Sequence, residues 1–490
     1  QYEAGNPGKN ISDIRANMYA PIKDIMQMLT DPEDTRPIVL VEYLYQIRNS
    51  GGGMQKFYEL VENHKRFQGG YIWDWMDKAL LNKTKDGVEF YAYGGDFNES
   101  YTDEVHPGFM TNNGIILPDL TPKPVAYEVK HYYSPIIIEE VKYNSPWILD
   151  PGPCHLLIKN RSLVFDSSYY ELLYTIREDG YPIDTGDFQL PLIKAGEEAK
   201  VKLDLTYDKK PNKKYLIDLS VRYARDTAFA EKGYELACFQ FSIDGGRGIT
   251  TTEAKGKLDS SLNAAVADLW DFKLKSDSVV IQNKKANITV VFDNKSGLLK
   301  ALKKDNLEYL ISGPKECFTR PHSGIDACEG WGRFSLWNVF DENKTVSELE
   351  SMDVIPSSGG TIFVETVRMV RFTDYPYINR IKALYIINAD GNISATFTFV
   401  LDSSLPDLPR VGVELIIPEG FENLKYYGRG PIENYRDRKG SAILGVHESA
   451  VEKEHFPYNP PSENGGHEDT LWLSLTNSDD KGIIIASDAE

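Results

Sequence analysis

The chain has 490 residues, of which 41% are hydrophobic and 12% aromatic, and a formal net charge of −19 at pH 7. This length exceeds that of one hydrophobic core, so the sequence predicts about two to four domains. The negative charge argues against nucleic acids and anionic membrane surfaces as partners, whereas a neutral sugar is compatible with it. No apolar run approaches the roughly 18 residues of a membrane-spanning helix, and the few cysteines fit neither a disulfide scaffold nor a zinc site.

The first 133 residues predict the last third of a (β/α)8 barrel. The expected elements, in chain order, are a helix at residues 22–29, a buried strand at 37–42, a helix from Met54 to His64, a buried strand at 69–75 and a long loop region at 82–125. Strands that are apolar on both faces are typical of a parallel sheet covered by helices. Because a closed barrel of this type has eight strands, we expect further barrel strands upstream of this chain.

Glu42 is the first polar residue at the end of the 37–42 strand. The carboxyl ends of barrel strands converge on one face, and that face holds the catalytic residues. Several aromatic residues fall within two or three strand ends, namely Tyr19, Tyr43, Tyr45, Trp73 and Trp75. Aromatic faces beside carboxylates suit sugar rings, whose C–H faces are apolar and whose hydroxyls need acceptors. The alternative is a structural ion pair of Glu42 with Arg36 or Arg48, which is about as common.

The rest of the chain predicts two all-β domains joined by a linker. Residues 134–243 contain short alternating strands and no helix, best seen at 215–223, and predict an immunoglobulin-like β-sandwich. Residues 244–267 form the linker, and residues 268–490 predict a large antiparallel β-sandwich in which Asp390-Gly391 is a hairpin turn. We expect this sandwich to continue beyond the chain, because it would otherwise expose a sheet edge. An ion-pair network that fixes a loop is expected from four charged residues, Glu433, Arg436, Asp437 and Arg438.

Several motifs along the chain are distinctive. They are RPIVLVEYLYQIRNS at 36–50, QGGYIWDWMD at 68–77, YGGDF at 93–97, residues 110–131 ending in TPKPVAYEVKH, FTRPHSG at 318–324, YGRGPIENYRDR at 427–438 and YNPPSENG at 458–465. They resemble the bacterial β-galactosidases of glycoside hydrolase family 2, and the last three resemble the mutarotase-like C-terminal domain of those enzymes. The resemblance implies a multidomain α/β plus all-β fold. Its parts are the C-terminal part of a TIM barrel at 1–133, an immunoglobulin-like β-sandwich at 134–243 and an incomplete mutarotase-like β-sandwich at 268–490.

The resemblance also implies a retaining exo-β-glycosidase, a β-galactosidase that hydrolyses terminal non-reducing β-D-galactosides. In this comparison Glu42 corresponds to the nucleophile, Tyr19 to a tyrosine that hydrogen-bonds near it, and Trp73 to a floor of the galactose pocket. Asn113 corresponds to an asparagine near C6 of the sugar, where the family holds a sodium ion, and Met110 is the other candidate ligand. The acid/base glutamate and most ligands of the family's Mg²⁺ site fall outside the chain. We expect a homo-oligomer, in the bacterial cytoplasm or periplasm.

The chain departs from the family at two positions after Glu42. Tyr45 stands where the family usually has histidine, and Arg48 stands where it has glycine. Both are candidate substrate-binding residues, because a tyrosine changes the hydrogen bonding near C6 and an inward arginine binds a carboxylate or sulfate. One hypothesis is therefore a galactoside altered at C6, such as a galacturonide or a sulfated or methylated galactose. The structural alternative is that Tyr45 repacks and Arg48 faces solvent. A third hypothesis, of another class, is a non-catalytic carbohydrate-binding assembly.

We predict that these 490 residues alone do not hydrolyse a nitrophenyl β-galactoside. Proton donation to the leaving group is worth about 10²- to 10⁴-fold, and the expected acid/base glutamate lies outside the chain. The measurement is nitrophenol release by the purified chain, with the full-length protein as the control. Turnover comparable to that of the full-length protein would contradict the prediction.

Overall fold

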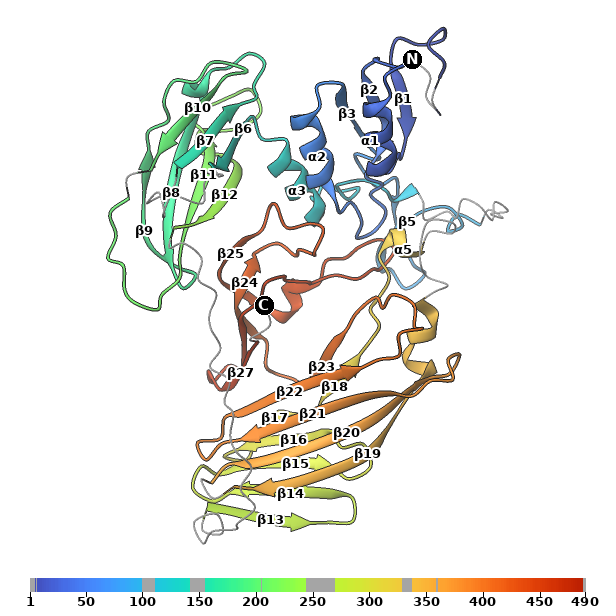
Figure 1. The fold of residues 1–490 in the computed structure, drawn as a ribbon, viewed down its shortest axis with the longest axis vertical. Helices are drawn as coiled ribbons and strands as arrows, with labels where there is room; N and C mark the ends of the chain where they lie inside the picture. The colour runs from blue at the N-terminus through green and yellow to red at the C-terminus, as the bar shows by residue number, and fades with distance from the viewer. Residues whose placement is uncertain are drawn as a thin grey trace.

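The computed structural model describes residues 5, 7–98, 111–141, 155–203, 205–243, 269–327, 337–357 and 360–487. Strands predominate in these residues and helices are few. Figure 1 shows three bodies: a small α/β unit at the start of the chain, a sandwich with β6 to β12, and a large β-structure formed by the last part. Among the described residues no helix has the length and hydrophobicity to span a membrane. The expected linker at 244–267 lies outside these residues.

The α/β unit has a parallel sheet with the strand order β1-β2-β3. Its elements are β1 (Arg15–Met18), α1 (Ile22–Thr30), β2 (Ile38–Tyr43), α2 (Met54–Asn63), β3 (Phe67–Ile72) and, later in the chain, α3 (Pro124–Tyr132). Apolar side chains of the strands and helices form one core, among them Ile25, Leu40 and Leu60. The predicted strand–helix–strand order is confirmed. Glu42 is the last residue but one of β2, because the strand continues to Tyr43.

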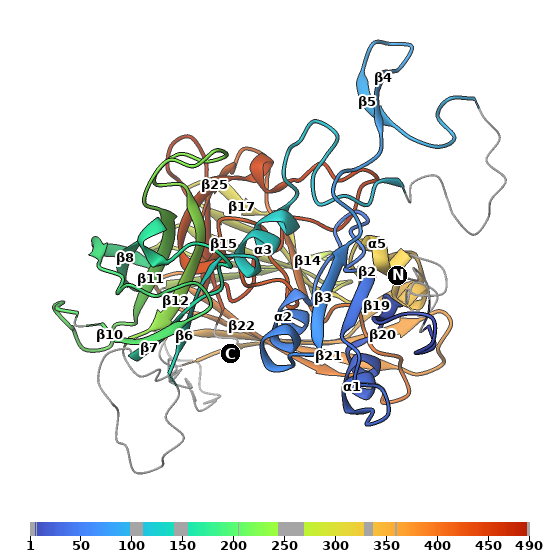
Figure 2. The ribbon, with the colours of Figure 1, turned by 90° about the horizontal axis from the view of Figure 1, so that it is seen from above.

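Part of the region that we expected to be a loop is a β-hairpin. β4 (Leu80–Lys83) pairs with β5 (Glu89–Ala92), and the turn between them contains Gly87 at a φ of 84°. The hairpin stands apart from the other strands (Figure 2), and the apolar side chains of Leu80 and Leu81 are exposed. Ala92 of β5 is buried, but β4 contributes no buried apolar face to the hairpin. Without such a face its strands lack the alternation from which a strand is predicted.

Two sheets with a common core form the first sandwich. Its strands are β6 (Ile136–Glu140), β7 (His155–Asn160), β8 (Tyr170–Glu178), β9 (Tyr181–Phe188), β10 (Glu198–Lys202), β11 (Tyr215–Tyr223) and β12 (Glu235–Ser242). They are ordered β10-β7-β6 in one sheet and β12-β11-β8-β9 in the other. Side chains of both sheets, such as Ile158 and Leu219, belong to one hydrophobic cluster. The prediction of a sandwich of short strands is confirmed.

The strand at 215–223 alternates in sequence, yet both of its faces are buried. All residues from 215 to 221 are buried, including the charged Asp218. The Asp218 carboxylate accepts hydrogen bonds from Arg177 at 2.6 Å and from Gln240 at 2.8 Å. Gln240 also donates to the carbonyl of Leu444 at 2.8 Å, in the last part of the chain. Contact with the last part therefore covers the polar face, which alternation alone does not reveal.

The last part of the chain is antiparallel and contains two sheets that face each other. One consists of β13 (Trp270–Leu274), β14 (Ser278–Asn283), β15 (Ile288–Asp293), β16 (Leu299–Lys304) and β17 (Leu307–Leu310); the other consists of β19 (Thr345–Pro356), β20 (Ile362–Phe372), β21 (Asn379–Ile387) and β22 (Ile393–Val400). They share a core that includes Val290 and Tyr385. The predicted Asp390-Gly391 hairpin turn joins β21 to β22, with Gly391 at a φ of 91°, and is confirmed.

Smaller elements of the last part lie between this sandwich and the other two bodies (Figure 1). They are the pair β18 (Ser312–Cys317) and β23 (Gly412–Ile416), the short helix α5 (Gly324–Ala327), and a sheet ordered β25-β24-β26-β27 from β24 (Asn423–Gly430), β25 (Ile443–Ala450), β26 (Trp472–Thr476) and β27 (Gly482–Ala486). Leu216 of β11 packs against Tyr427 of β24 and Leu444 of β25. This contact joins the first sandwich to the last part of the chain.

Helix α3 connects the α/β unit to both other bodies. The ring of His131 lies 4.9 Å, between centroids, from the ring of Phe239 on β12. The buried carboxylate of Glu128 accepts hydrogen bonds from the backbone N–H groups of Gly440 at 3.1 Å and Ser441 at 2.8 Å. Because α3 also packs in the core of the α/β unit, these contacts fix the strand ends relative to the last part of the chain.

We expect the contact between α3 and β12 to weaken in acid because of His131. Its Nδ1 is buried without a hydrogen-bond partner among the described residues, and burial lowers the pKa of the ring from 6.5 to about 4. Between these two pH values the unfolded chain binds a proton that the folded chain does not, so the free energy of unfolding falls as the pH falls. From pH 7 to pH 4 the loss is about 3 kcal/mol for this group.

The measurement is urea unfolding of the chain at pH 7 and at pH 4. His131→Phe keeps an aromatic ring beside Phe239. In this variant the decrease in the free energy of unfolding between pH 7 and pH 4 is expected to be smaller by about this amount. His64→Phe, at the C-terminal end of α2, is the matched control and is expected to retain the full decrease. The same pH dependence in the wild type and in His131→Phe would refute the prediction.

Candidate active site

Glu42 and Tyr19 are held together at the carboxyl ends of two neighbouring strands. Met18 of β1 pairs with Glu42 of β2, and the Tyr19 N–H donates to the Glu42 carbonyl at 2.9 Å. Burial and the nearby carboxylate of Glu42 raise the pKa of Tyr19. The phenol therefore keeps its proton at neutral pH and can donate a hydrogen bond toward the carboxylate.

Tyr45, Trp73 and Asn113 lie next to this pair. The Tyr45 ring meets the Tyr19 ring edge to face, with centroids 5.9 Å apart, and the Asn113 amide nitrogen lies 3.5 Å from the Tyr45 hydroxyl. The backbone N–H of Trp73 donates to the Tyr43 carbonyl at 3.1 Å, which places Trp73 beside the end of β2. Trp73 is 38% exposed, whereas Tyr45 and Asn113 are buried. Aromatic, amide and carboxylate groups thus gather at one end of the sheet, as a sugar site requires.

A buried ion pair fixes the segment that carries Asn113. The Lys123 ammonium lies 2.7 Å from the Asp77 carboxylate, and both side chains are 0% exposed. The same Asp77 oxygen accepts a hydrogen bond from the Gly114 N–H at 2.7 Å, and the Asp74 N–H donates to the Asn113 carbonyl at 2.5 Å. Burial raises the pKa of Asp77, and the charge of Lys123 opposes that shift. These bonds tie the residues after β3 to the segment that carries Asn113.

The other two predicted site residues are Arg48 and Met110. Arg48 lies near Tyr93, whose pKa is raised by burial against the effect of the Arg48 charge, and near His322, whose pKa is lowered by burial and further by that charge. A contact of Arg48 with the sugar at C6 stays a prediction. Met110 lies outside the described residues. Arg36, the other partner considered for Glu42, forms its ion pair with Asp34 at 2.7 Å.

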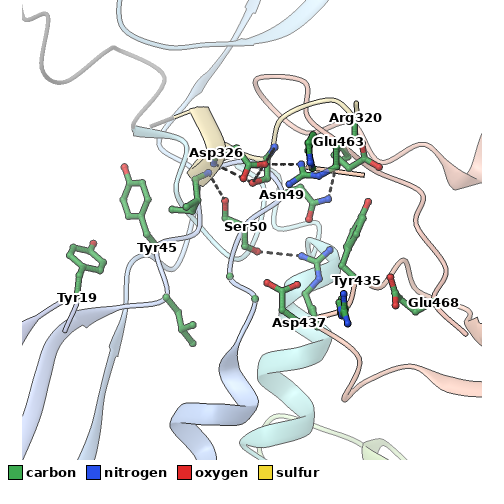
Figure 3. A pocket seen from close by; sticks show the side chains of 18 of the residues that line it. Tyr19, Tyr45, Asn49, Ser50, Arg320, Asp326, Tyr435, Asp437, Glu463 and Glu468 are labelled. Atoms are coloured by element: carbon green, nitrogen blue, oxygen red, sulfur yellow. Dashed lines mark hydrogen bonds and ion pairs between the residues drawn. The ribbon is translucent and has the colours of Figure 1, made fainter. Parts of the chain in front are cut away.

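A cavity of about 1020 Å³ opens beside Tyr19 and Tyr45 (Figure 3). The strand ends and the loop after β2 form one wall, and the last part of the chain forms the other. The charged or polar lining residues of the second wall are Arg320, Ser323, Asp326, Arg410, Tyr435, Arg436, Asp437, Arg438, Glu463 and Glu468. Sequence reasoning missed this wall as a site, because no local pattern indicates that these loops face the ends of β1 and β2.

The expected network at residues 433–438 is only partly formed. Arg438 and Glu433 make a buried ion pair at 2.9 Å, and the Tyr458 hydroxyl donates to the same carboxylate at 2.5 Å. Arg436 and Asp437 are exposed, line the cavity and make no ion pair within the described part of the chain. For these two residues the expected ion pairing is not found among the described residues, and both line the cavity instead.

Three family models match the chain in succession. The TIM barrel domain of glycosyl hydrolases family 2 matches residues 4–138, domain 4 of β-galactosidase matches residues 156–244, and the β-galactosidase small chain matches residues 284–489. The resemblance to glycoside hydrolase family 2 β-galactosidases is confirmed. It extends through all three bodies of the structure.

Curated β-galactosidases match nearly the whole chain. The one from Priestia megaterium is 28% identical over 97% of this chain and 43% of its own length, and the one from Streptococcus thermophilus is 28% identical over 96% and 44%. The one from Clostridium acetobutylicum is 29% identical over 89% and 44%. The chain thus spans less than half the length of these relatives. A solved β-glucuronidase 2 of Bacteroides uniformis aligns with 83% of this chain and 46% of its own at 12% identity and a TM-score of 0.21, which supports no statement about the fold.

We expect Lys123→Met to destabilise the α/β unit by about 3–5 kcal/mol, because it leaves the Asp77 charge buried without its partner. The matched control is Lys83→Met, which breaks the ion pair with Glu89 whose side chains are 63% and 57% exposed. Exposed pairs contribute only about 0–1 kcal/mol. Urea unfolding followed by tryptophan fluorescence measures both variants. Equal destabilisation by the two substitutions would rule out a special role for the buried pair.

Proposed function

We propose that this chain forms part of a retaining exo-β-glycosidase, a β-galactosidase that acts on terminal non-reducing β-D-galactosides. The observation that carries the proposal is the placement of Tyr19 beside Glu42 at the ends of two parallel strands, with Trp73 alongside. A protonated phenol beside a carboxylate can orient it for attack without neutralising it as a cation would. The names of the curated relatives, all β-galactosidases, support galactose as the sugar.

In the first step the Glu42 carboxylate attacks C1 of the sugar, and the bond from C1 to the glycosidic oxygen breaks as a glycosyl ester forms. Tyr19 keeps its proton and holds one carboxylate oxygen, so the other is free to attack. The leaving oxygen takes a proton from a second carboxylic acid about 5 to 5.5 Å from the nucleophile, which we place outside this chain. The second carboxylate then activates water, which hydrolyses the ester with net retention.

The other site residues bind the sugar. Trp73 offers a half-exposed aromatic face against which the apolar side of a galactose ring packs. Tyr45 and Asn113 supply a hydroxyl and an amide for the sugar hydroxyls. The cavity beside Tyr19 has charged, hydroxyl and aromatic groups in its lining, and we assign it to the leaving group of the glycoside.

We extend the proposal to the two β-domains. The first sandwich, with sheets of three and four strands, is immunoglobulin-like and occupies residues 134–243. The last part, residues 268–490, is mutarotase-like. Both domains brace the α/β unit of residues 1–133, since α3 contacts both of them.

A non-catalytic carbohydrate-binding assembly is the alternative function. A binding module needs aromatic platforms but no carboxylate that is held at the end of a barrel strand, so the surroundings of Glu42 favour an enzyme. The upstream gene sequence discriminates between the two. An Asn-Glu pair at the end of an earlier barrel strand supports the enzyme, and its absence supports the binding assembly.

We predict that a 2-fluoro galactoside with a good leaving group labels Glu42 in the full-length protein. The fluorine destabilises the cationic transition state of the second step, so the glycosyl ester accumulates. Mass spectrometry of proteolytic peptides locates the label.

Glu42→Gln is expected to abolish labelling, and Glu33→Gln, which changes an exposed carboxylate in the same segment, is expected to preserve it. A label on another acidic residue would overturn the assignment of the nucleophile. Turnover without any covalent label would instead argue against the retaining mechanism.

A further inference from the structure

The ammonium group of Lys78 lies at the Asn113 end of the site. Its Nζ donates to the Asn113 side-chain oxygen at 3.0 Å and pairs with the carboxylate of Asp74. It also lies 5.4 Å from the centroid of the Trp73 ring, within the range of a cation–π contact. One positive charge therefore touches an amide oxygen, a carboxylate and the aromatic platform to which we assign the sugar.

The backbone holds Lys78 in this place independently of its side chain. The Lys78 N–H donates to the Thr111 carbonyl at 3.0 Å, and Met76 forms a parallel bridge with Ile116. The segment after β3 thus runs beside the segment that carries Asn113. The buried pair of Asp77 with Lys123 joins the same two segments. The contact between Lys78 and Asn113 therefore follows from the register of these two segments.

These residues do not fit the sodium ion that the family resemblance implies at Asn113. A monovalent cation needs oxygen ligands, and the Asn113 amide oxygen already accepts a hydrogen bond from an ammonium. A sodium ion on the same oxygen would lie close to a second positive charge and would be repelled by it. Within the described ranges no cluster of three or more His, Cys, Asp or Glu side chains could hold a metal ion.

We infer that Lys78 supplies, as a tethered ammonium, the positive charge at the C6 end of the sugar pocket, and that substrate binding here needs no sodium. The inference rests on the proposed function for its substrate. An ammonium has three N–H donors, and within the described residues two of them are used by Asn113 and Asp74. The third donates to the oxygen on C6, whether hydroxyl or carboxylate. The side chain is 49% exposed, so a ligand can reach it.

The first test measures kcat/KM of the full-length protein on nitrophenyl β-galactoside in sodium chloride and in choline chloride. The wild type is expected to be equally active in both salts. Lys78→Gln removes the charge and is expected to lower kcat/KM in choline by about tenfold or more, mainly through KM, since hydrogen bonds to charged groups are worth that much. Sodium is expected to restore part of this loss, because the vacated oxygen is then free to bind it.

Two variants serve as controls in this test. Lys78→Arg retains the positive charge and is expected to remain independent of sodium. Lys85→Gln removes an exposed lysine from the turn of the neighbouring hairpin and is expected to behave as the wild type. Equal stimulation of the wild type and Lys78→Gln by sodium would overturn the inference, as would an unchanged KM in Lys78→Gln.

A second test does not depend on turnover. The ²³Na NMR linewidth is measured with the 490-residue chain and with its variants. We expect broadening with Lys78→Gln beyond that seen with the wild type and Lys85→Gln. Equal broadening in all three would contradict the role of Lys78. If the full-length protein cleaves no galactoside at all, the proposed function fails, whereas the NMR comparison still decides whether Lys78 occupies the cation position.

Discussion

The arrangement of the candidate site depends on an ion pair from which water is excluded. Removing the charges of Asp77 and Lys123 from water costs several kcal/mol for each ion, and their mutual attraction and the hydrogen bond from Gly114 offset that cost. The second Asp77 oxygen has no hydrogen-bond partner among the described residues, so the compensation is incomplete. The pair therefore adds little net stability. A different register between the segment after β3 and the segment that carries Asn113 would separate Asp77 from Lys123 and leave a buried charge unpaired. This penalty favours the register in which Asn113 lies beside the Trp73 segment.

A second buried pair acts in the same way at the boundary with the last part of the chain. Arg438, paired with Glu433, also donates to the Ser50 carbonyl at 3.3 Å, and the Gly53 N–H donates to the Asp437 carbonyl at 2.7 Å. The loop after β2 is thus fixed by the last part of the chain, while Glu128 of α3 fixes the other side of the α/β unit. The three strands of the α/β unit share only a small core. Their position relative to the last part of the chain therefore depends on these polar contacts as well as on apolar burial.

The sequence predicted those features that are determined by neighbouring residues. The apolar run before Glu42 is a buried parallel strand, and Asp390-Gly391 is a hairpin turn. Features that depend on contacts between distant segments were not predictable from the sequence. Asp218 is buried because Gln240 reaches Leu444, and the wall of the cavity exists because the loop after β2 meets the last part of the chain.

Lys78 shows the same limit at the site itself. In the sequence it is a charged residue shortly after a strand, which is typical of a solvated surface. Its significance follows from the pairing of two segments that are 35 residues apart, which brings its ammonium to Asn113. Arg48, which follows Glu42 closely in the sequence, lies in a loop near Tyr93 and His322, and its contact with the sugar stays a prediction.

The charges around the cavity bear on the kind of ligand it can accept. Arg320 is paired with Asp326 at 2.7 Å and Arg410 with Glu463 at 2.9 Å, so neither guanidinium contributes a large net field. Paired charges still present hydrogen-bond donors and acceptors to a ligand, and Arg436 and Asp437 add further ones to this wall. Such a wall suits a neutral, hydroxyl-rich molecule better than a polyanion, which agrees with the net charge of −19. Within this arrangement, the ammonium that we propose for a C6 substituent is that of Lys78 at the strand ends, which is itself paired with Asp74, and not one of the guanidinium groups of the opposite wall.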